Sequence, residues 1–378
     1  MAKREVVVTG IGLISALGSL STSWQRLLAG ESAVKLRQPF GEISPLPMAL
    51  IGETSAQLIP LTQLIVDAAL EDSGLIAPLT DCGVVVGSSR GCQGVWEELM
   101  RGQPQDLSNW LNTLPHQAGI ATAIKIGSQA QVLAPMAACA TGIWAIARGW
   151  ELLQMGECQR VIVGAVEAPI TPLTLAGFEK MGALAKTGCY PFDRLREGLA
   201  LGEGGAVLVL ETAELARERK AKVYGQILGF GLTADGYHIS APNPNGSSGI
   251  SAIKQCLHNS NLFPLDIDYI HAHGTSTQLN DRNEAKLIEK LFPPGVAVSS
   301  TKGATGHTLG ASGAIGTAFS LLALQQQILP PCVGLKESEF ALNVLTQPQQ
   351  GNFQNALCFS FGFGGQNAVL AITRATPE

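Results

Sequence analysis

Short apolar runs alternate along the chain with longer stretches in which apolar residues recur at helical spacing. The apolar runs predict strands at residues 6–12, 83–89, 160–168, 206–211, 269–274, 296–300 and 367–372. The helical spacing predicts helices near residues 60–73, 141–155, 249–260, 281–291 and 311–327. Because the strands are apolar on both faces and helices separate many of them, the pattern predicts an α/β fold whose sheet is covered on both sides.

The two halves of the chain also resemble each other in three places that occur in the same order. The matching segments are TGIGLISALG (9–18) with LGFGLTADG (228–236), CATGIWAIARGWELL (139–153) with GASGAIGTAFSLLAL (310–324), and GEGGAVLVLE (202–211) with GFGGQNAVLAI (362–372). In the first pair we expect a G-x-G-L turn that leaves a strand, and in the second a small-residue start of an apolar helix. We infer two homologous halves, residues 1–212 and 213–378, joined near the charged segment AELARERKAK.

The first half is the longer one, so insertions are expected near residues 30–60 and 90–130, as caps or as oligomer contacts. Two stretches without formal charge, 126–147 and 303–335, are long enough to be taken for membrane spans. Both are rich in Gly, Ala, Ser and Thr, which favours helices buried inside an α/β protein.

Composition narrows the class of protein. The chain has 378 residues, 46% of them hydrophobic, and a net charge of −5, which argues against general binding to nucleic acid or to an anionic membrane. Its eight cysteines show no metal-ligand spacing, so we expect no metal site. The N-terminus leads directly into a strand without a secretory apolar segment, and we expect a cytoplasmic protein with reduced thiols.

Candidate chemistry begins at Cys139, in MAACATGIW. A thiol at a helix start lies at the positive end of the helix dipole, which would favour the thiolate, and small neighbours would leave space for a substrate. The alternative is a buried structural cysteine, which is the interpretation we keep for the other seven. His273 in HAHGTST and His307 in TKGATGH lie where strands end and Gly/Thr-rich loops begin, and with Cys139 they would suit thiol chemistry. The other histidines, at positions 116, 238, 258 and 271, lack this context.

Other polar and glycine-rich segments could complete such a site. The turn in FSFGFGGQN (359–367) could aim backbone N–H groups at one point and, with the N–H of Cys139, form an oxyanion hole. Lys302 could supply positive potential. Asp281 and Glu284 lie one turn apart at a helix start, where they could hold Lys302 or cap the helix, and for Asp281 we expect capping.

In this order, the motifs ACATG, HGTST, KGATGH and SFGFGG resemble those of the β-ketoacyl-acyl-carrier-protein synthases, the decarboxylating condensing enzymes of the thiolase superfamily. The resemblance runs from the first strand to the last, and the elongating type-II-like enzymes and polyketide ketosynthases match best. It implies a thiolase-like fold, with two βαβαβαββ halves in a five-layer αβαβα sandwich. It also implies a two-carbon extension of an acyl chain with malonyl-carrier, without a cofactor.

The resemblance assigns roles residue by residue. It implies that Cys139 accepts the acyl group and that His273 and His307 favour malonyl decarboxylation and stabilise the enolate. Lys302 would support the second histidine, and Glu284 would be the buried acid that interacts with this lysine. Further implied roles belong to Phe363 as the gate whose N–H joins the oxyanion hole, to Asp235 in a mobile loop, and to Thr275, Thr277 and Gly364 in substrate binding.

The implied partners are an acyl carrier protein and a second copy of the chain, with a heterodimer beside a second ketosynthase as an alternative. Basic residues that could meet an acidic carrier are sparse, and the candidates are Arg194, Arg196 and Lys125. Two other functions stay open. One is a non-catalytic partner of the chain-length-factor kind, which the intact Cys139 and histidines disfavour. The other is a thiolase-like condensation on CoA thioesters, which needs a second cysteine near the glycine turn, whereas Cys358 lies in the strand before it.

Overall fold

The computed structural model describes residues 3–102 and 107–375. Its main strands are β1 (Val6–Ser15), β2 (Gly18–Ser19), β5 (Gly83–Gly87), β6 (Val132–Leu133), β7 (Arg160–Glu167), β9 (Gly204–Thr212), β10 (Gly225–Ala234), β11 (Tyr269–His271), β12 (Ala297–Ser299), β14 (Asn343–Val344), β16 (Asn355–Gly362) and β17 (Gln366–Arg374). In the described part of the chain they form one sheet in the order β14-β12-β11-β16-β17-β10-β1-β9-β7-β5-β6, with β2 paired to β1. The seven predicted strands are all present.

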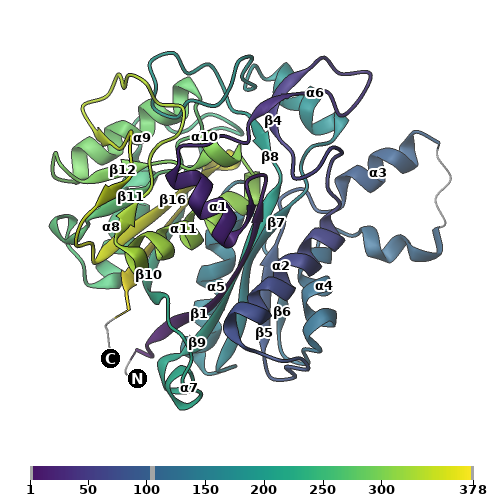
Figure 1. Ribbon diagram of the computed structural model, residues 1–378, viewed down its shortest axis with the longest axis vertical. Helices are drawn as coiled ribbons and strands as arrows, with labels where there is room; N and C mark the ends of the chain where they lie inside the picture. The colour runs from purple at the N-terminus through teal and green to yellow at the C-terminus, as the bar shows by residue number, and fades with distance from the viewer. Residues whose placement is uncertain (1–2, 103–106, 376–378) are drawn as a thin grey trace.

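The α-helices of the described residues are α1 (Leu20–Leu28), α2 (Leu58–Ser73), α3 (Gln93–Met100), α4 (Gln117–Ile126), α5 (Thr141–Met155), α6 (Pro172–Lys180), α7 (Ala213–Glu218), α8 (Ser247–Ser260), α9 (Gln278–Leu291), α10 (Lys302–Thr305) and α11 (Ser312–Gln326). The five predicted helices are confirmed. Helices α5 and α11 pack on each other between the two arms of the sheet, α2 and α4 cover one outer face, and α8 and α9 cover the other (Figure 1). This arrangement is the expected five-layer αβαβα sandwich.

Both halves of the sandwich share one chain order. The first runs β1-α2-β5-α4-β6-α5-β7-β9 and the second β10-α8-β11-α9-β12-α11-β16-β17, so the fold is the expected pair of βαβαβαββ units. The two arms of the sheet meet where β1 pairs antiparallel with β10. Helix α7 lies where we placed the boundary between residues 212 and 213, and that boundary stays a prediction.

The prediction for the glycine pairs near the start of each half was wrong. We expected turns there, but Gly10 and Gly12 lie inside β1, and Gly229 and Gly231 lie inside β10. Each strand has a bulge just before its first glycine of the pair. A Cβ on Gly12 would overlap the carbonyl oxygen of Ile65 in α2, so these glycines let an outer helix approach the strand closely.

The two predicted insertions have different surroundings. Residues 30–60 contain β3 (Lys35–Arg37) and β4 (Leu46–Ala49), which form a small sheet with β8 (Leu201–Gly202). Residues 90–130 contain α3, a 3-10 helix (Leu107–Thr113) and α4; residues 103–106 lie outside the described part of the chain. Helix α3 has no buried residue and projects from the body of the protein (Figure 1).

The uncharged stretch 303–335 contains α11, which is buried on all sides from Ser312 to Leu324. In the described residues, no helix combines the length and the apolar character that a membrane crossing requires.

The close approach of α2 to β1 gives a stability prediction. We expect Gly12→Ala to lower the free energy of unfolding by about 2–4 kcal/mol, because the new methyl group has no space beside α2. Chemical denaturation measures the change.

Gly177→Ala is the matched control. Gly177 is exposed inside α6, and a Cβ there would meet nothing within 4 Å. Alanine at this position is expected to raise stability by about 0.5–1 kcal/mol, since it is the better helix former. Equal effects of the two substitutions would contradict the packing argument.

Candidate active site

The candidate residues converge because of where the strands end. Strands β11, β12 and β16 run parallel within one arm of the sheet, and β5, β6 and β7 within the other. His273 follows β11, and His307 lies between β12 and α11. Cys139 lies at the equivalent place of the first half, between β6 and α5. The carboxyl ends of parallel strands meet at one edge of a sheet, which brings these loops together.

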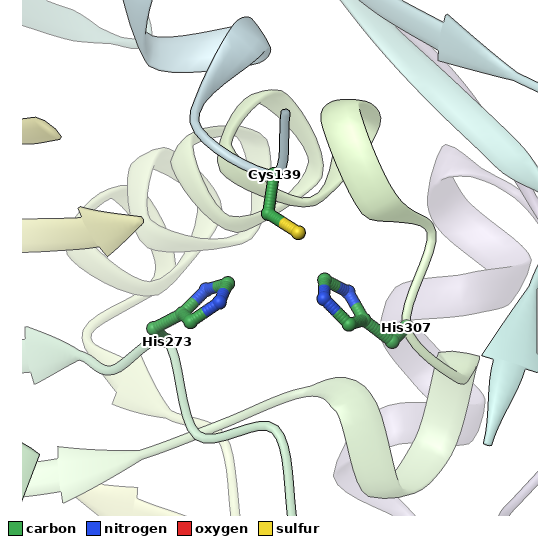
Figure 2. A group of neighbouring side chains, drawn as sticks. All are labelled: Cys139, His273 and His307. Carbon is green, nitrogen blue, oxygen red and sulfur yellow. The ribbon is translucent and has the colours of Figure 1, made fainter. Parts of the chain in front are cut away.

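The three side chains form one cluster. The Cys139 sulfur and a ring nitrogen from each of His273 and His307 all lie within 4.8 Å of one another. Figure 2 shows the two imidazole rings beside each other, with the sulfur of Cys139 above them, and the ring centres lie 5.3 Å apart. All three residues are buried, yet they line a cavity of about 280 Å³. The convergence expected from sequence motifs far apart in the chain is therefore present.

The nucleophile turn has a distinctive backbone. Ala138 has a φ of 47°, a left-handed conformation that costs about 1–2 kcal/mol in a residue with a Cβ. Leu309, its counterpart in the repeat, has a φ of 44°. Both helix starts that follow thus leave the same kind of tight turn.

The small residues around the thiol were expected to leave space for a substrate, but they also allow two helices to pack closely. A Cβ on Gly142 would lie 2.5 Å from the backbone nitrogen of Ala314, and a Cβ on Gly313 would lie 2.8 Å from the side chain of Ile143. The glycines therefore allow the starts of α5 and α11 to touch. Space for a substrate is provided by the cavity in front of Cys139.

Lys302 was expected to support the second histidine, His307, but its hydrogen bond goes to the first: Lys302 and Glu284 hold the backbone that carries His273. The Lys302 ammonium donates a hydrogen bond to the carbonyl oxygen of His273. The Glu284 carboxylate accepts the backbone N–H of His273 and, at 2.7 Å, that of Gly274. No direct ion pair joins Lys302 to Glu284 among the described residues; the two groups interact through the field and through His273.

Burial and the Lys302 charge decide the protonation of the histidines. Burial lowers the pKa of His273 well below its usual value, and Lys302 and then His307 lower it further. Burial and Lys302 likewise hold the pKa of His307 well below its usual value. Both rings are therefore neutral near pH 7, and each can donate one ring N–H and accept at the other nitrogen.

The thiol corrects our expectation of a stabilised thiolate. Burial raises the pKa of Cys139 to about 11, although the nearby Lys302 charge and a hydrogen bond from the backbone N–H of Phe363 lower it in part. The resting group is the thiol, because desolvation outweighs the charges and the hydrogen bond that favour the thiolate. A neutral histidine is the available base.

The ring nitrogens of the two histidines differ in their surroundings. His307 Nδ1 lies 2.9 Å from the hydroxyl of Ser312, which leaves its other nitrogen free to act. His273 Nδ1 is buried and has no hydrogen-bond partner among the described residues. A buried polar atom without a partner is costly, and a bound substrate would compensate that cost.

The glycine turn after β16 lies against the nucleophile. The Ser360 hydroxyl donates to the carbonyl oxygen of Cys139 at 2.7 Å. Phe363 follows, with its N–H at the thiol and its ring 5.9 Å from that of Phe178. The N–H groups of Cys139 and Phe363 are thus placed beside the sulfur.

Asp235 ties a loop to this turn. Its backbone N–H donates to the carbonyl of Gly365 at 2.9 Å, and its carboxylate accepts from the backbone N–H of Asn243 and the side chain of Asn367. A Cβ on Gly365 would overlap the Asp235 side chain. The Asp235 loop is therefore in direct contact with the turn that carries Phe363.

Of the three residues assigned to substrate binding, two line the cavity and one does not. Thr275 and Thr277 line the cavity, with hydroxyls 2.9 Å apart. Gly364 is not among the lining residues; its N–H donates to the carbonyl of Ile239.

The predicted roles of two charged residues, Asp281 and Arg196, were wrong. Asp281 does not cap its own helix, because it lies buried inside the first turn and accepts the backbone N–H of Phe192 at 2.8 Å. Arg196 is fully buried, between Asp281 and Glu339, so it cannot meet a carrier protein. Arg194 and Lys125 are accessible and pair with Glu337 and Asp67.

Some site residues escaped the sequence analysis. Phe178 belongs to none of the motifs, and Ser360 lies in the SFGFGG motif but was given no role; only contacts in the fold reveal both. Ser312 starts the second copy of the repeated helix, so the repeat contained a signal for it. A thiol and two imidazoles are also donors that zinc accepts, and the expectation that the site works without a metal stays a prediction.

Comparison with known proteins identifies the family. The model of the β-ketoacyl synthase N-terminal domain matches residues 54–216, and that of the C-terminal domain matches residues 224–336. The chain belongs to the β-ketoacyl synthase family. Its resemblance to this family, first seen in four short motifs, therefore extends over most of the chain.

Relatives cover nearly the whole of this synthase. It is 34% identical to 3-oxoacyl-[acyl-carrier-protein] synthase 2 of Mycobacterium bovis, covering 98% of this chain and 97% of the relative. The synthase 2 of Coxiella burnetii is 33% identical, with 99% of both chains covered. Among solved structures, a β-ketoacyl synthase from Burkholderia phymatum is 26% identical with a TM-score of 0.89, covering 99% of this chain and all of that one. The ishigamide ketosynthase/chain length factor is 25% identical with a TM-score of 0.90 and the same coverage.

The reactivity of the synthase thiol should follow its raised pKa. We expect the rate of Cys139 alkylation by iodoacetamide to keep rising from neutral pH to about pH 10, because only the thiolate reacts. Peptide mass spectrometry measures the rate at this cysteine, with Cys139→Ala as the background. Lys302→Met should slow the reaction at a given pH, since the Lys302 charge lowers the thiol pKa. A rate that levels off near pH 8 would instead show a thiolate stabilised by the helix start.

Proposed function

We propose that this chain is a 3-oxoacyl-[acyl-carrier-protein] synthase that joins malonyl-carrier to an acyl group held on Cys139. The product is an acyl chain two carbons longer, of a fatty-acid or polyketide kind. The observation that carries the proposal is one buried thiol flanked by two neutral histidines at the wall of a cavity. The proposed steps use no cofactor.

In the first step Cys139 takes the acyl group from its carrier. A histidine ring nitrogen accepts the thiol proton, the sulfur attacks the thioester carbonyl, and the carrier thiol leaves with a proton. The developing oxyanion is stabilised by the N–H groups of Cys139 and Phe363.

In the second step malonyl-carrier enters and loses CO2, which leaves an enolate. His273 and His307 each donate a ring N–H to the enolate oxygen, as neutral imidazoles can. Lys302 and Glu284 act as positioning residues, because they hold the backbone of His273. The enolate carbon attacks the acyl-Cys139 carbonyl, and the thiolate is released.

The cavity supports the assignment of further roles. Thr275 and Thr277 line it and bind the carrier arm, whereas Gly364 serves the turn that carries Phe363. We infer that Phe363, with the Asp235 loop, gates access to the thiol. The contacts of Asp235 with Gly365 support this coupling.

The partner follows from the reaction. A solved relative, 25% identical with a TM-score of 0.91, is titled as a type II PKS acyl-carrier protein in complex with its ketosynthase. We propose that an acyl carrier protein docks on this chain too, with Arg194 and Lys125 as the remaining accessible candidates for contact. The homodimer, the heterodimer alternative and the cytoplasmic location stay predictions.

The alternatives fit less well. A chain-length-factor-like partner would not need the intact cluster of Cys139 and two histidines. A thiolase-like reaction would need a second thiol in the cavity, but Cys358 is buried against α11, with its sulfur 3.7 Å from the carbonyl oxygen of Gly313.

Single substitutions separate the two steps. Cys139→Gln should abolish acylation and condensation but retain decarboxylation of malonyl-carrier, since both histidines remain. His273→Ala and His307→Ala should each reduce decarboxylation by about 10²–10³-fold, because each removes one donor to the enolate. Intact-mass analysis of acyl-carrier incubations and CO2 release measure the two steps. No acyl adduct on the unmodified protein would refute the proposed function.

A further inference from the structure

Arg90 is a charged side chain that the reaction above does not use. It follows β5 by three residues, and its guanidinium carbon lies 5.6 Å from the centre of the Phe178 ring. Its Nε is buried and has no hydrogen-bond partner, and Arg90 makes no ion pair among the described residues. Guanidinium is charged at any physiological pH, so this unpaired donor is costly unless an acceptor joins it.

A series of contacts connects Arg90 to the nucleophile. The backbone of Phe363 contacts Cys139, and the ring of Phe363 packs against the ring of Phe178. The Arg90 guanidinium lies over the Phe178 ring. Phe178 lines the same cavity as Cys139. The Arg90 charge also reaches the thiol, since it lowers the pKa of Cys139. Arg90 is not itself among the residues that line the cavity, so an acyl group on Cys139 meets this cation only where it extends past the Phe178 ring.

Within residues 3–102 and 107–375, no carboxylate forms an ion pair with this cation. One acid whose pKa its charge lowers is Glu167, at the end of β7. The carboxylate oxygens of Glu167 already accept the hydroxyl of Ser88 at 3.0 Å and the backbone N–H of Ser89. Glu167 is thus engaged in holding the β5 loop rather than Arg90.

We propose that Arg90 is a specificity-determining residue that binds an oxygen acceptor, a carboxylate or a keto group, on the acyl chain carried by Cys139. The inference rests on the proposed function. An alkyl chain beside Arg90 would leave its donors unpaired and exclude water from them, whereas an oxygen acceptor satisfies the planar donor fork. Arg90 takes no part in bond making; the Cys139 sulfur still displaces the carrier thiol.

The test compares thioesters of equal length. Hexanoyl-, 5-oxohexanoyl- and adipoyl-carrier differ only at the end of the chain, and acyl-Cys139 formation is followed by intact-mass analysis. We expect the protein to react with at least one oxygenated thioester about tenfold or more faster than with hexanoyl-carrier. A preference for adipoyl identifies a carboxylate as the ligand, and a preference for 5-oxohexanoyl identifies a keto group.

Variants assign the preference to Arg90. Arg90→Met should abolish it, mainly by slowing the oxygenated thioester, and Arg90→Lys should retain part of a carboxylate preference because the charge remains. Arg148→Met is the matched control: Arg148 also has a buried Nε without a hydrogen bond and lies over an aromatic ring, but that ring, of Trp144, does not line the cavity as the ring of Phe178 does. Arg148→Met should leave the preference unchanged.

Clear outcomes would overturn the inference. Equal rates for the three thioesters, or a preference for hexanoyl, would refute it on the unmodified protein alone, even if Arg90→Met fails to fold. An equal change of all three rates in Arg90→Met would give Arg90 a structural role only. Acetyl-carrier, which is too short to reach past Phe178, separates the two proposals: if acetyl does not load Cys139 either, the proposed function fails and this inference fails with it.

Discussion

The contact between the starts of α5 and α11 is the constraint on which the site depends. Gly142 and Gly313 let the two helices touch at the centre of the sandwich. Cys139 precedes one helix and His307 precedes the other, so this single contact places a thiol beside an imidazole. A larger residue at either glycine would separate the helix starts and the reacting groups together.

Burial then decides the chemistry of the groups that the helices bring together. A thiol and two imidazoles lose most of their solvent, and the nearby Lys302 charge makes protonation of the rings still less favourable. The result is a set of neutral groups that can exchange one proton among themselves. Neutral donors suit an enolate that forms inside the protein, because they stabilise it without a permanent charge in the site.

More of the fold than of the active site could be predicted from the sequence. Apolar runs and helical periodicity placed seven of the strands and α5, and the internal repeat indicated the duplication. The prediction of turns at the G-x-G-L segments was wrong, because a glycine can allow the close approach of a helix to a strand, as with α2 and β1, as well as a turn. Motifs located Cys139 and His273, but the pKa of a thiol depends on burial, which no local pattern shows. Contacts between distant segments, such as Arg90 on Phe178, follow only from packing.

The most direct test of this account is the protonation state of His273 and His307 in the folded protein. NMR of the protein labelled with ¹³C-histidine, with the two signals assigned by His273→Ala and His307→Ala, follows each ring across a pH titration. We predict that neither ring gains a proton between about pH 8 and pH 5.5, because burial and Lys302 hold both pKa values well below the usual value. A midpoint near pH 6.5 for either ring would contradict the account.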